Sequence, residues 1–489
     1  MIREFAKDMG KYFPAQIVPG LVGFVSIPIL TRLFLPDAYG DYRLVLATTG
    51  VLATFSEWLP MAVIRFAPGF ERDGRLGFLY GNVVALCGIT TVLFTGLAIV
   101  LLAVLRPYLS SRLYALMWPG ILVFALTTVF VTAQHVLRAK RAIASYSVSA
   151  AWQSAAGFGL AMLLVTAWGP RIEFLIWGMA AAVGMALPLL WRQAFDQPLS
   201  GLRVSPSVFR DMMAYSAPLV LGNVAAWVLS LGDRYVLQWF GDSHAVGVYS
   251  ASYGVSESTV LLLAKLFMLA GGPLAVHVWE KEGEPAAAAF LTKQARYYLL
   301  VCVPAVVALS VLAKPMVHLL MDEEYWDGYR IIPFVTAGVL LLGLNQRFQT
   351  GLSLVRRTSV ITVCTVLAGA VNLGLNILLI PQHGYMGAAY ATLISYAVLL
   401  ALSACCARRL FAWQFPFRSL VNAGIASLVA GAGAYYVGNL GSISAASALV
   451  SGICVGSLVY LVLLLLLREF GQEEVEFARK VASGSPRGT

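Results

Sequence analysis

Apolar and polar positions alternate along this chain in long blocks, with runs of about 20 apolar residues separated by short polar connections. An apolar helix of that length is long enough to cross the hydrocarbon core of a bilayer. The pattern therefore predicts an all-α polytopic membrane protein with about 14 transmembrane helices. The predicted spans are 12–35, 42–64, 78–105, 113–136, 145–168, 174–191, 213–240, 246–278, 288–312, 331–352, 360–380, 386–407, 420–440 and 446–467.

Two of these spans carry the same sequence features in the same order. The first has Arg32 near its end and is followed by AYGDY at 38–42. The seventh has Arg234 and is followed by AVGVY at 245–249. Because both copies run in the same direction, they indicate a parallel internal repeat about an axis along the membrane normal. We therefore expect two pseudo-symmetric six-helix lobes and two additional C-terminal helices.

The repeat also divides the chain into segments. We expect an N-lobe at residues 1–195, a cytoplasmic linker at 196–212 and a C-lobe at 213–412. Two extra spans at 413–468 and a cytoplasmic tail at 469–489 follow.

Composition agrees with a membrane protein. Apolar residues make up 59% of the chain and charged residues only 12%, whereas soluble domains carry about 25% charged residues. Most of the 34 lysines and arginines lie in connections on the same side as the N-terminus, so we expect both termini in the cytoplasm. Topology therefore accounts for the net charge of +10 without nucleic acid. The six cysteines have no metal-ligand spacing and are interpreted as apolar helix residues.

Four segments resemble one family in the same order along the chain. They read ILTRLFLPDAYGDYRLV, GDRYVLQWFGDSHAVGVYSASY, MDEEYWDGYRIIP and LIPQHGYMGAAYATLISY. On these the chain is identified as a member of the multidrug/oligosaccharidyl-lipid/polysaccharide exporter superfamily, on the branch of O-antigen and polysaccharide flippases.

The resemblance implies a flippase rather than an enzyme. Such a protein moves a polyprenyl-pyrophosphate-linked oligosaccharide from the inner to the outer leaflet of the cell inner membrane, for lipopolysaccharide or another surface polysaccharide. The implied partners are that glycan, membrane lipid and other polysaccharide assembly proteins, with no nucleic acid and no cofactor.

Charged residues inside predicted spans are candidates for function, because each costs at least ~2.5–3.5 kcal/mol in hydrocarbon. Asp233 and Arg234 are adjacent, and neighbouring helix positions point about 100° apart. We therefore expect one to face a central cavity and the other a neighbouring helix; the alternative is a structural ion pair between the lobes. Glu57 is interpreted as a packing residue, with a proton-coupling carboxylate as the alternative.

Four cations are candidates to bind the pyrophosphate, whose oxygens suit the planar donors of arginine. Arg234 and Lys265 lie inside spans, and Lys265 is expected to be buried. Arg65 can alternatively be a cytoplasmic flanking charge. Arg32, at a span end, can alternatively reach the outer headgroups.

A set of oxygen-bearing side chains is the candidate site for a coupling ion. Asp233, Asn372, Asn376 and Thr392 together offer the all-oxygen ligands that suit a hard cation such as Na⁺. Lipid II flippases of the same superfamily resemble this set, but they can carry an Asp where this chain has Asn376. Na⁺ binding should therefore be weak, or Asp233 should hold a proton instead. The alternative is ordinary hydrogen bonding between helices. Glu57 and Glu257 are further coupling candidates.

Two other classes of protein remain as alternatives. A drug or cation antiporter of the same superfamily typically has twelve spans and an acidic cavity. A polysaccharide polymerase or ligase normally has a large outer loop with catalytic residues. The basic residues inside spans, the two additional spans and the short connections disfavour both.

Overall fold

The computed structural model describes residues 2–438, 445–471 and 474, and these residues form helices and connections without a strand. Fourteen helical segments are long and apolar enough to cross a membrane. The predicted all-α polytopic class is confirmed.

The first part of the chain forms helices α1 to α9. Their bounds are α1 Ile2–Leu33, α2 Pro36–Ser56, α3 Trp58–Arg72, α4 Leu76–Leu105, η1 Arg106–Tyr108, α5 Ser111–Ala139, α6 Ile143–Trp168, α7 Glu173–Ala194, α8 Pro206–Leu231 and α9 Asp233–Phe240.

The second part forms α10 to α18. Their bounds are α10 Ser243–Ser256, η2 Glu257–Leu261, α11 Leu262–Glu282, α12 Glu284–Val311, α13 Ala313–Leu320, η3 Glu323–Ile331, α14 Ile332–Leu354, α15 Thr358–His383, α16 Tyr385–Leu410, α17 Phe417–Gly438 and α18 Ala445–Leu466. Segment η2 is a π-helix, and η1 and η3 are 3₁₀-helices.

Several helices extend beyond the predicted spans, because hydropathy detects only the apolar part of a helix. The second span was predicted to end at residue 64, but it continues through α3 to Arg72, with an interruption at Glu57. The seventh span divides at Gly232 into α8 and α9. The predicted tail at 469–489 is described only at 469–471 and 474.

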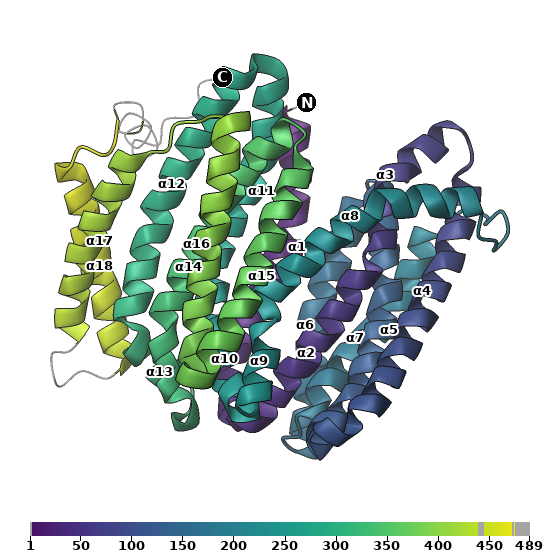
Figure 1. The fold of residues 1–489 in the computed structure, drawn as a ribbon, viewed down its shortest axis with the longest axis horizontal. Coiled ribbons are helices and arrows are strands. Elements are labelled where there is room, and N and C mark those ends of the chain that lie inside the picture. Colours follow the sequence, from purple (N-terminus) through teal and green to yellow (C-terminus); the bar gives the residue numbers. More distant parts are fainter. Residues whose placement is uncertain (1, 439–444, 472–473, 475–489) are drawn as a thin grey trace.

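Two helices pack against segments distant from them in sequence. Figure 1 shows α2 to α7 gathered on one side and α10 to α18 on the other. Helix α1 packs against α6 and also contacts α10 and α11, and α8 packs against both α3 and α15. The two groups are therefore joined by more than the connecting chain, and the predicted lobe boundaries stay a prediction.

Helix α1 begins and helix α18 ends at the same side of the helix bundle, which we call the terminal side (Figure 1). The opposite side, where α9 ends and α10 begins, is called the distal side.

On the distal side the two A-x-G-x-Y motifs pack directly against each other. A Cβ atom placed on Gly40 would lie 1.9 Å from the carbonyl oxygen of Ser243, and one placed on Gly247 would lie 2.0 Å from that of Pro36. Both positions therefore require glycine for helices α2 and α10 to approach this closely. The Ser243 hydroxyl also donates a hydrogen bond to Asp41 at 2.6 Å, which ties the same two helices together.

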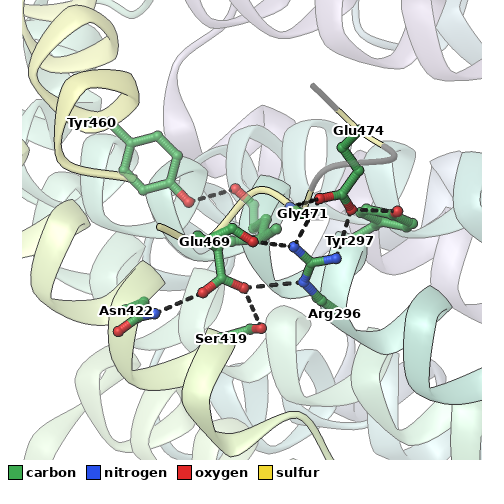
Figure 2. Close-up of polar contacts among 9 residues, drawn as sticks. Arg296, Tyr297, Ser419, Asn422, Tyr460, Glu469, Gly471 and Glu474 are labelled. Atoms are coloured by element: carbon green, nitrogen blue, oxygen red, sulfur yellow. Dashed lines mark hydrogen bonds and ion pairs between the residues drawn. The ribbon is translucent and has the colours of Figure 1, made fainter. Parts of the chain in front are cut away.

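The C-terminal end of the described chain is held against α12 by a group of charged side chains (Figure 2). The Arg296 guanidinium donates to the Glu469 carboxylate at 3.1 Å and to Glu474 at 2.6 Å. Ser419 and Asn422 of α17 also donate to Glu469. One arginine thus joins α12 to the segment after α18 and, through Glu469, to α17.

These contacts change the acidity of both carboxyl groups. Hydrogen bonds from Arg296 hold the pKa of Glu474 at about 2, against its ordinary value of 4.5. Burial alone would raise the pKa of Glu469, but the hydrogen bonds from Ser419, Asn422 and Arg296 outweigh it and lower that pKa. Because both pKa values are depressed in the folded protein, the stabilisation is present above about pH 4.5 and is lost as pH falls towards 2.

We therefore predict that Glu474→Gln lowers the free energy of unfolding at pH 7 by about 1 kcal/mol, a value reduced by partial exposure to solvent. The deficit relative to wild type should narrow as pH falls from 5 to 3, because the Glu474 carboxyl of the unfolded wild type, with its ordinary pKa of 4.5, takes up a proton in this range. The difference in the free energy of unfolding between variant and wild type is measured at each pH in mixed detergent micelles. Glu282→Gln, at an exposed position, is the control. A deficit that does not change with pH would contradict the assignment.

The glycine contact gives a second prediction. Gly40→Ala should separate the distal ends of α2 and α10, because its methyl group overlaps the Ser243 carbonyl. Spin labels at the exposed positions Leu35 and Trp239, in a background without native cysteines, should report a longer distance. Gly88→Ala, where a Cβ meets open space, should leave the distance unchanged. Equal distances in both variants would show that this contact does not hold the two helices together.

Candidate functional site

The charged pair that the sequence places inside the seventh span lies at the start of α9. Helix α8 ends at Leu231, and after Gly232 the chain continues as α9 with Asp233 as its first residue. Asp233 is 2% exposed and Arg234 is fully buried. The Arg234 Nη1 donates to Asp233 Oδ1 at 2.9 Å and to the Ser230 carbonyl at 2.9 Å.

This geometry corrects the prediction that the two side chains face different surroundings. Neighbouring positions of α9 still point about 100° apart, but the long side chain of Arg234 bends back, so that its Nη1 reaches Asp233 Oδ1 at 2.9 Å. The two charges therefore neutralise each other within one segment.

Helices α10 and α16 complete the surroundings of the pair. The Tyr249 hydroxyl donates to Asp233 Oδ2 at 2.5 Å and lies 3.5 Å from the Thr392 hydroxyl. The Arg234 guanidinium carbon lies 4.9 Å from the ring centre of Tyr253, a cation–π distance. Asp233 and Thr392, predicted to act together, thus contact the same tyrosine.

The pair is incompletely satisfied by hydrogen bonds. Within the described part of the chain, Arg234 Nε and Nη2 have no hydrogen-bond partner. Removing one member of a buried ion pair typically costs 3–5 kcal/mol, because the other charge stays buried and unpaired. The pair therefore favours one arrangement of α9 against α10 for as long as both charges remain. Two N–H groups of the Arg234 guanidinium remain available to bind a further acceptor.

The predicted amide pair lies on α15, which packs against α9. Asn372 and Asn376 are buried, and Asn376 Nδ2 donates to Asn372 Oδ1 at 3.0 Å. This leaves the Asn376 oxygen without a partner. No hydrogen bond among the described side chains joins these amides to Asp233, so a cation site formed by all four residues stays a prediction. Nor do the described residues contain a group of three His, Cys, Asp or Glu side chains suited to a metal ion.

The two other carboxylates lie at breaks in helices. Glu57, at the break between α2 and α3, accepts a hydrogen bond from Asn223 of α8 at 3.0 Å. This contact agrees with a packing role. Glu257 begins the π-helix η2, and its half-buried side chain lines a cavity. Short π-helical segments occur frequently at functional sites.

The cavity has a volume of about 530 Å³ and lies among α8, α10, η2, α14, α15 and α16. Its lining includes Ser230 and Tyr253, both of which contact Arg234. One end of the cavity therefore reaches the surroundings of the ion pair.

The remaining predicted cations lie elsewhere. Arg32 is exposed and donates to the Leu319 carbonyl at the end of α13, at 2.6 Å. Arg65 is exposed on α3. Lys265 was predicted to be buried, which is wrong: its side chain is exposed on α11. Hydropathy places a residue inside a span but does not show which face of the helix is covered. No contact among the described side chains joins these three to Arg234.

Sequence reasoning did not select Arg347 of α14 as a candidate, although this cation lies within the predicted span 331–352. It is 1% exposed, and its guanidinium carbon lies 4.2 Å from the ring centre of Tyr298. Its Nη1 donates to the Gly343 carbonyl at 2.5 Å, while Nε and Nη2 have no partner. The available signal was the polar triplet 345–347 within an otherwise apolar stretch.

Sequence comparison places the chain in a family. A family described as "Polysaccharide biosynthesis protein" matches residues 5–276, more than half of the chain. The protein therefore belongs to the polysaccharide biosynthesis protein family. It is also 23% identical over 310 residues to a protein of Haloferax volcanii described as a probable low-salt glycan biosynthesis flippase, Agl15. The matched regions span only 45% to 64% of the length of the curated relatives.

Structure comparison identifies the fold. The lipid II flippase MurJ in an inward closed conformation superimposes with a TM-score of 0.76 over 95% of this chain and 99% of that protein, at 13% identity. An inward-facing multidrug resistance MATE family transporter of the MOP superfamily gives a TM-score of 0.65 over 81% and 97%, at 12% identity. The chain therefore has the same fold as these two proteins, and the family match confirms the predicted relation to polysaccharide biosynthesis proteins.

The ion pair leads to a stability prediction. Asp233→Asn should lower the free energy of unfolding by about 3–5 kcal/mol, because it leaves Arg234 buried without a counter-charge. Replacing both residues by leucine should recover much of that loss. Unfolding in mixed detergent micelles measures both effects.

The adjacent pair Arg210–Asp211 is the matched control, because its side chains are 82% and 61% exposed. Asp211→Asn should cost less than about 1 kcal/mol. Equal losses in Asp233→Asn and Asp211→Asn would contradict the importance of the buried pair.

Proposed function

We propose that this protein is a flippase that moves a polyprenyl-pyrophosphate-linked oligosaccharide from the inner to the outer leaflet, by alternating access coupled to H⁺ or Na⁺. Its substrate is an O-antigen unit or another surface polysaccharide repeat. No enzymatic step is part of the proposal.

The observation that carries the proposal is the fully buried Asp233–Arg234 pair within a fourteen-span fold of the polysaccharide biosynthesis family. Ionisable residues inside a membrane protein are rare and typically mark the path of a substrate or ion. The flippases among the similar proteins support the same assignment.

The distribution of lysine and arginine supports an orientation. We assign the terminal side to the cytoplasm and the distal side to the outer surface, in the cell inner membrane. The closely packed glycines Gly40 and Gly247 then lie at the outer surface. The structure accordingly corresponds to a state in which α2 and α10 are closed at that surface.

We assign the pyrophosphate to the predicted cations. Arg234 has two donors without a partner, and Arg32, Arg65 and Lys265 carry exposed charges along the helices. Arginine can bind two phosphate oxygens at once. Because Arg234 is fully buried, it must leave Asp233 or move with α9 before it can reach a headgroup.

We assign the coupling ion to Asp233, with Thr392, Asn372 and Asn376 as additional ligands. A proton or Na⁺ at Asp233 would replace Arg234 as the counter-charge of the carboxylate. The orientation of α9 would then depend on whether the cation is present. Glu57 and Glu257 are secondary candidates for the same role.

The membrane potential favours export of an anion. An elementary charge moving through 100 mV gains ~2.3 kcal/mol, so a headgroup of charge −2 leaving a negative interior gains about twice that amount. We therefore assign the inward cation to triggering release and enforcing direction rather than to supplying the main driving force.

One observation favours a second candidate, a drug or cation antiporter. Glu257 is the one charged residue among those lining the cavity, and a carboxylate there could bind an organic cation. Increased sensitivity of a deletion strain to cationic drugs, without accumulation of a lipid-linked glycan, would support the antiporter and contradict the flippase.

The direct test is export. Deleting the protein should cause a lipid-linked glycan to accumulate inside the cell, and Arg234→Ala or Lys265→Ala should restore export less well than wild type at equal protein level. Arg171→Ala, an exposed residue between α6 and α7, is the control and should restore export fully. Wild-type export by both Arg234→Ala and Lys265→Ala would refute the proposed pyrophosphate site.

The coupling of transport to H⁺ or Na⁺ is tested separately, with the purified protein in liposomes. Asp233→Asn should abolish the dependence of transport on pH or on Na⁺, whichever the wild type shows, because an amide neither ionises nor attracts a cation as a carboxylate does. A dependence on pH and Na⁺ unchanged from wild type would exclude Asp233 as the coupling residue.

A further inference from the structure

We propose that the 530 Å³ cavity among α8, α10, η2, α14, α15 and α16 is a subsite for a neutral saccharide of the transported glycan. The inference rests on the proposed flippase function and extends it, because it separates sugar recognition from pyrophosphate recognition. The volume lies within the range of pockets that bind small organic molecules.

The lining of the cavity favours a ligand rich in hydroxyl groups. Four amide side chains face it, Asn223, Asn345, Gln346 and Gln349. An amide both donates and accepts hydrogen bonds, and so does each hydroxyl of a sugar. Serine, threonine and tyrosine side chains complete the polar lining. The arrangement suits a polyhydroxylated ligand better than a bare ion, which needs far less space.

Asn345 shows that a polar partner is required here. Its side chain is 1% exposed and lines the cavity, yet neither its amide nitrogen nor its amide oxygen has a hydrogen-bond partner among the described residues. The Gln346 oxygen is likewise unpartnered. A buried polar group without a partner costs about 1–3 kcal/mol. A ligand supplying both donors and acceptors would remove that cost.

Charge indicates which part of the substrate fits. No lysine or arginine is among the residues that line the cavity, and Glu257 is the one ionisable carboxylate there. An anionic group entering the cavity would therefore be repelled without compensation. The pyrophosphate and acidic sugars are disfavoured, and a neutral sugar is accepted.

The aromatic residues connect the cavity to the charged site. Tyr253 and Tyr396 both line it, and their hydroxyl groups lie 3.4 Å apart. The faces of aromatic rings can pack against the C–H faces of a pyranose. Arg234 lies 4.9 Å from the ring centre of Tyr253, so a sugar bound here would sit next to the residue assigned to the pyrophosphate.

The test compares two lipids on the purified protein in nanodiscs: polyprenyl pyrophosphate without sugar and the same lipid carrying a neutral disaccharide. Wild type should bind the sugar-bearing lipid about tenfold more tightly, as expected from one or two additional hydrogen bonds. Asn345→Leu should lose this difference while binding the sugarless lipid as wild type does. A difference that persists in Asn345→Leu, or that is absent in wild type, overturns the subsite.

Thermal unfolding distinguishes binding from structure. Asn345→Leu should melt at or above the wild-type temperature, because it removes an unpartnered buried amide. Ser427→Ala, which removes an equally buried and unpartnered hydroxyl on α17, is the control and should retain the tenfold difference. Loss of the difference in Ser427→Ala as well would show a general effect of altering the interior and would overturn the assignment.

A second measurement separates this inference from the proposed function. A cysteine at Thr362, which lines the cavity, is labelled with a maleimide in the presence of free N-acetylglucosamine, glucosamine or glucuronic acid. Protection by the neutral sugar and not by the acidic one supports the subsite, even if neither lipid binds and the flippase proposal fails. Stronger protection by glucosamine or by a cationic drug would indicate a cation site and overturn it, as would no protection by any of them.

Discussion

A pair of opposite charges that cannot reach water constrains the centre of this protein. Asp233 and Arg234 are adjacent in sequence and buried, and each is the nearest counter-charge of the other. Desolvating two charges is costly, and their attraction offsets that cost only in good geometry. The break at Gly232, the hydroxyl of Tyr249 and the ring of Tyr253 together provide that geometry.

The position of the pair allows α9 to connect a movement of the two charged residues to the distal ends of α2 and α10. This helix is only eight residues long, with the charged pair at its start and the α2–α10 contact just beyond its end. The Ser243 hydroxyl donates to Asp41 of α2 at 2.6 Å and lies 3.1 Å from the side-chain oxygen of Gln238 in α9. A rearrangement of the charged pair therefore reaches the distal surface through one short rigid element.

Hydropathy predicted the fourteen spans and the fold class, because apolar length is a property of local sequence. It also showed that Asp233 and Arg234 are charges inside a span, and the argument from oxygen ligands added Thr392. The structure brings all three to Tyr249. The direct Asp233–Arg234 contact could not be predicted in this way, because hydropathy and helix geometry do not show how the long arginine side chain bends.

The errors at Lys265 and Arg347 have one common cause. Both residues lie in apolar stretches, but Lys265 is exposed and Arg347 is buried over Tyr298. Which face of a helix is covered depends on its tertiary neighbours. The local sequence around a residue does not show which helices those neighbours are. The cavity was missed for the same reason, since its lining comes from six segments between residues 219 and 399.

The charged Asp233–Arg234 pair and the uncharged amides of the cavity occupy separate places. This arrangement suits a substrate that carries both a charged group and neutral polar groups. A surface able to bind pyrophosphate must be cationic, and a cationic surface offers few acceptors for sugar hydroxyls. The amide-lined cavity supplies such acceptors without adding positive charge. Because Tyr253 contributes to both surroundings, a change in the Arg234 partner would alter the cavity wall directly. Sugar occupancy and ion occupancy would then be coupled through one aromatic ring, without a longer path through the protein.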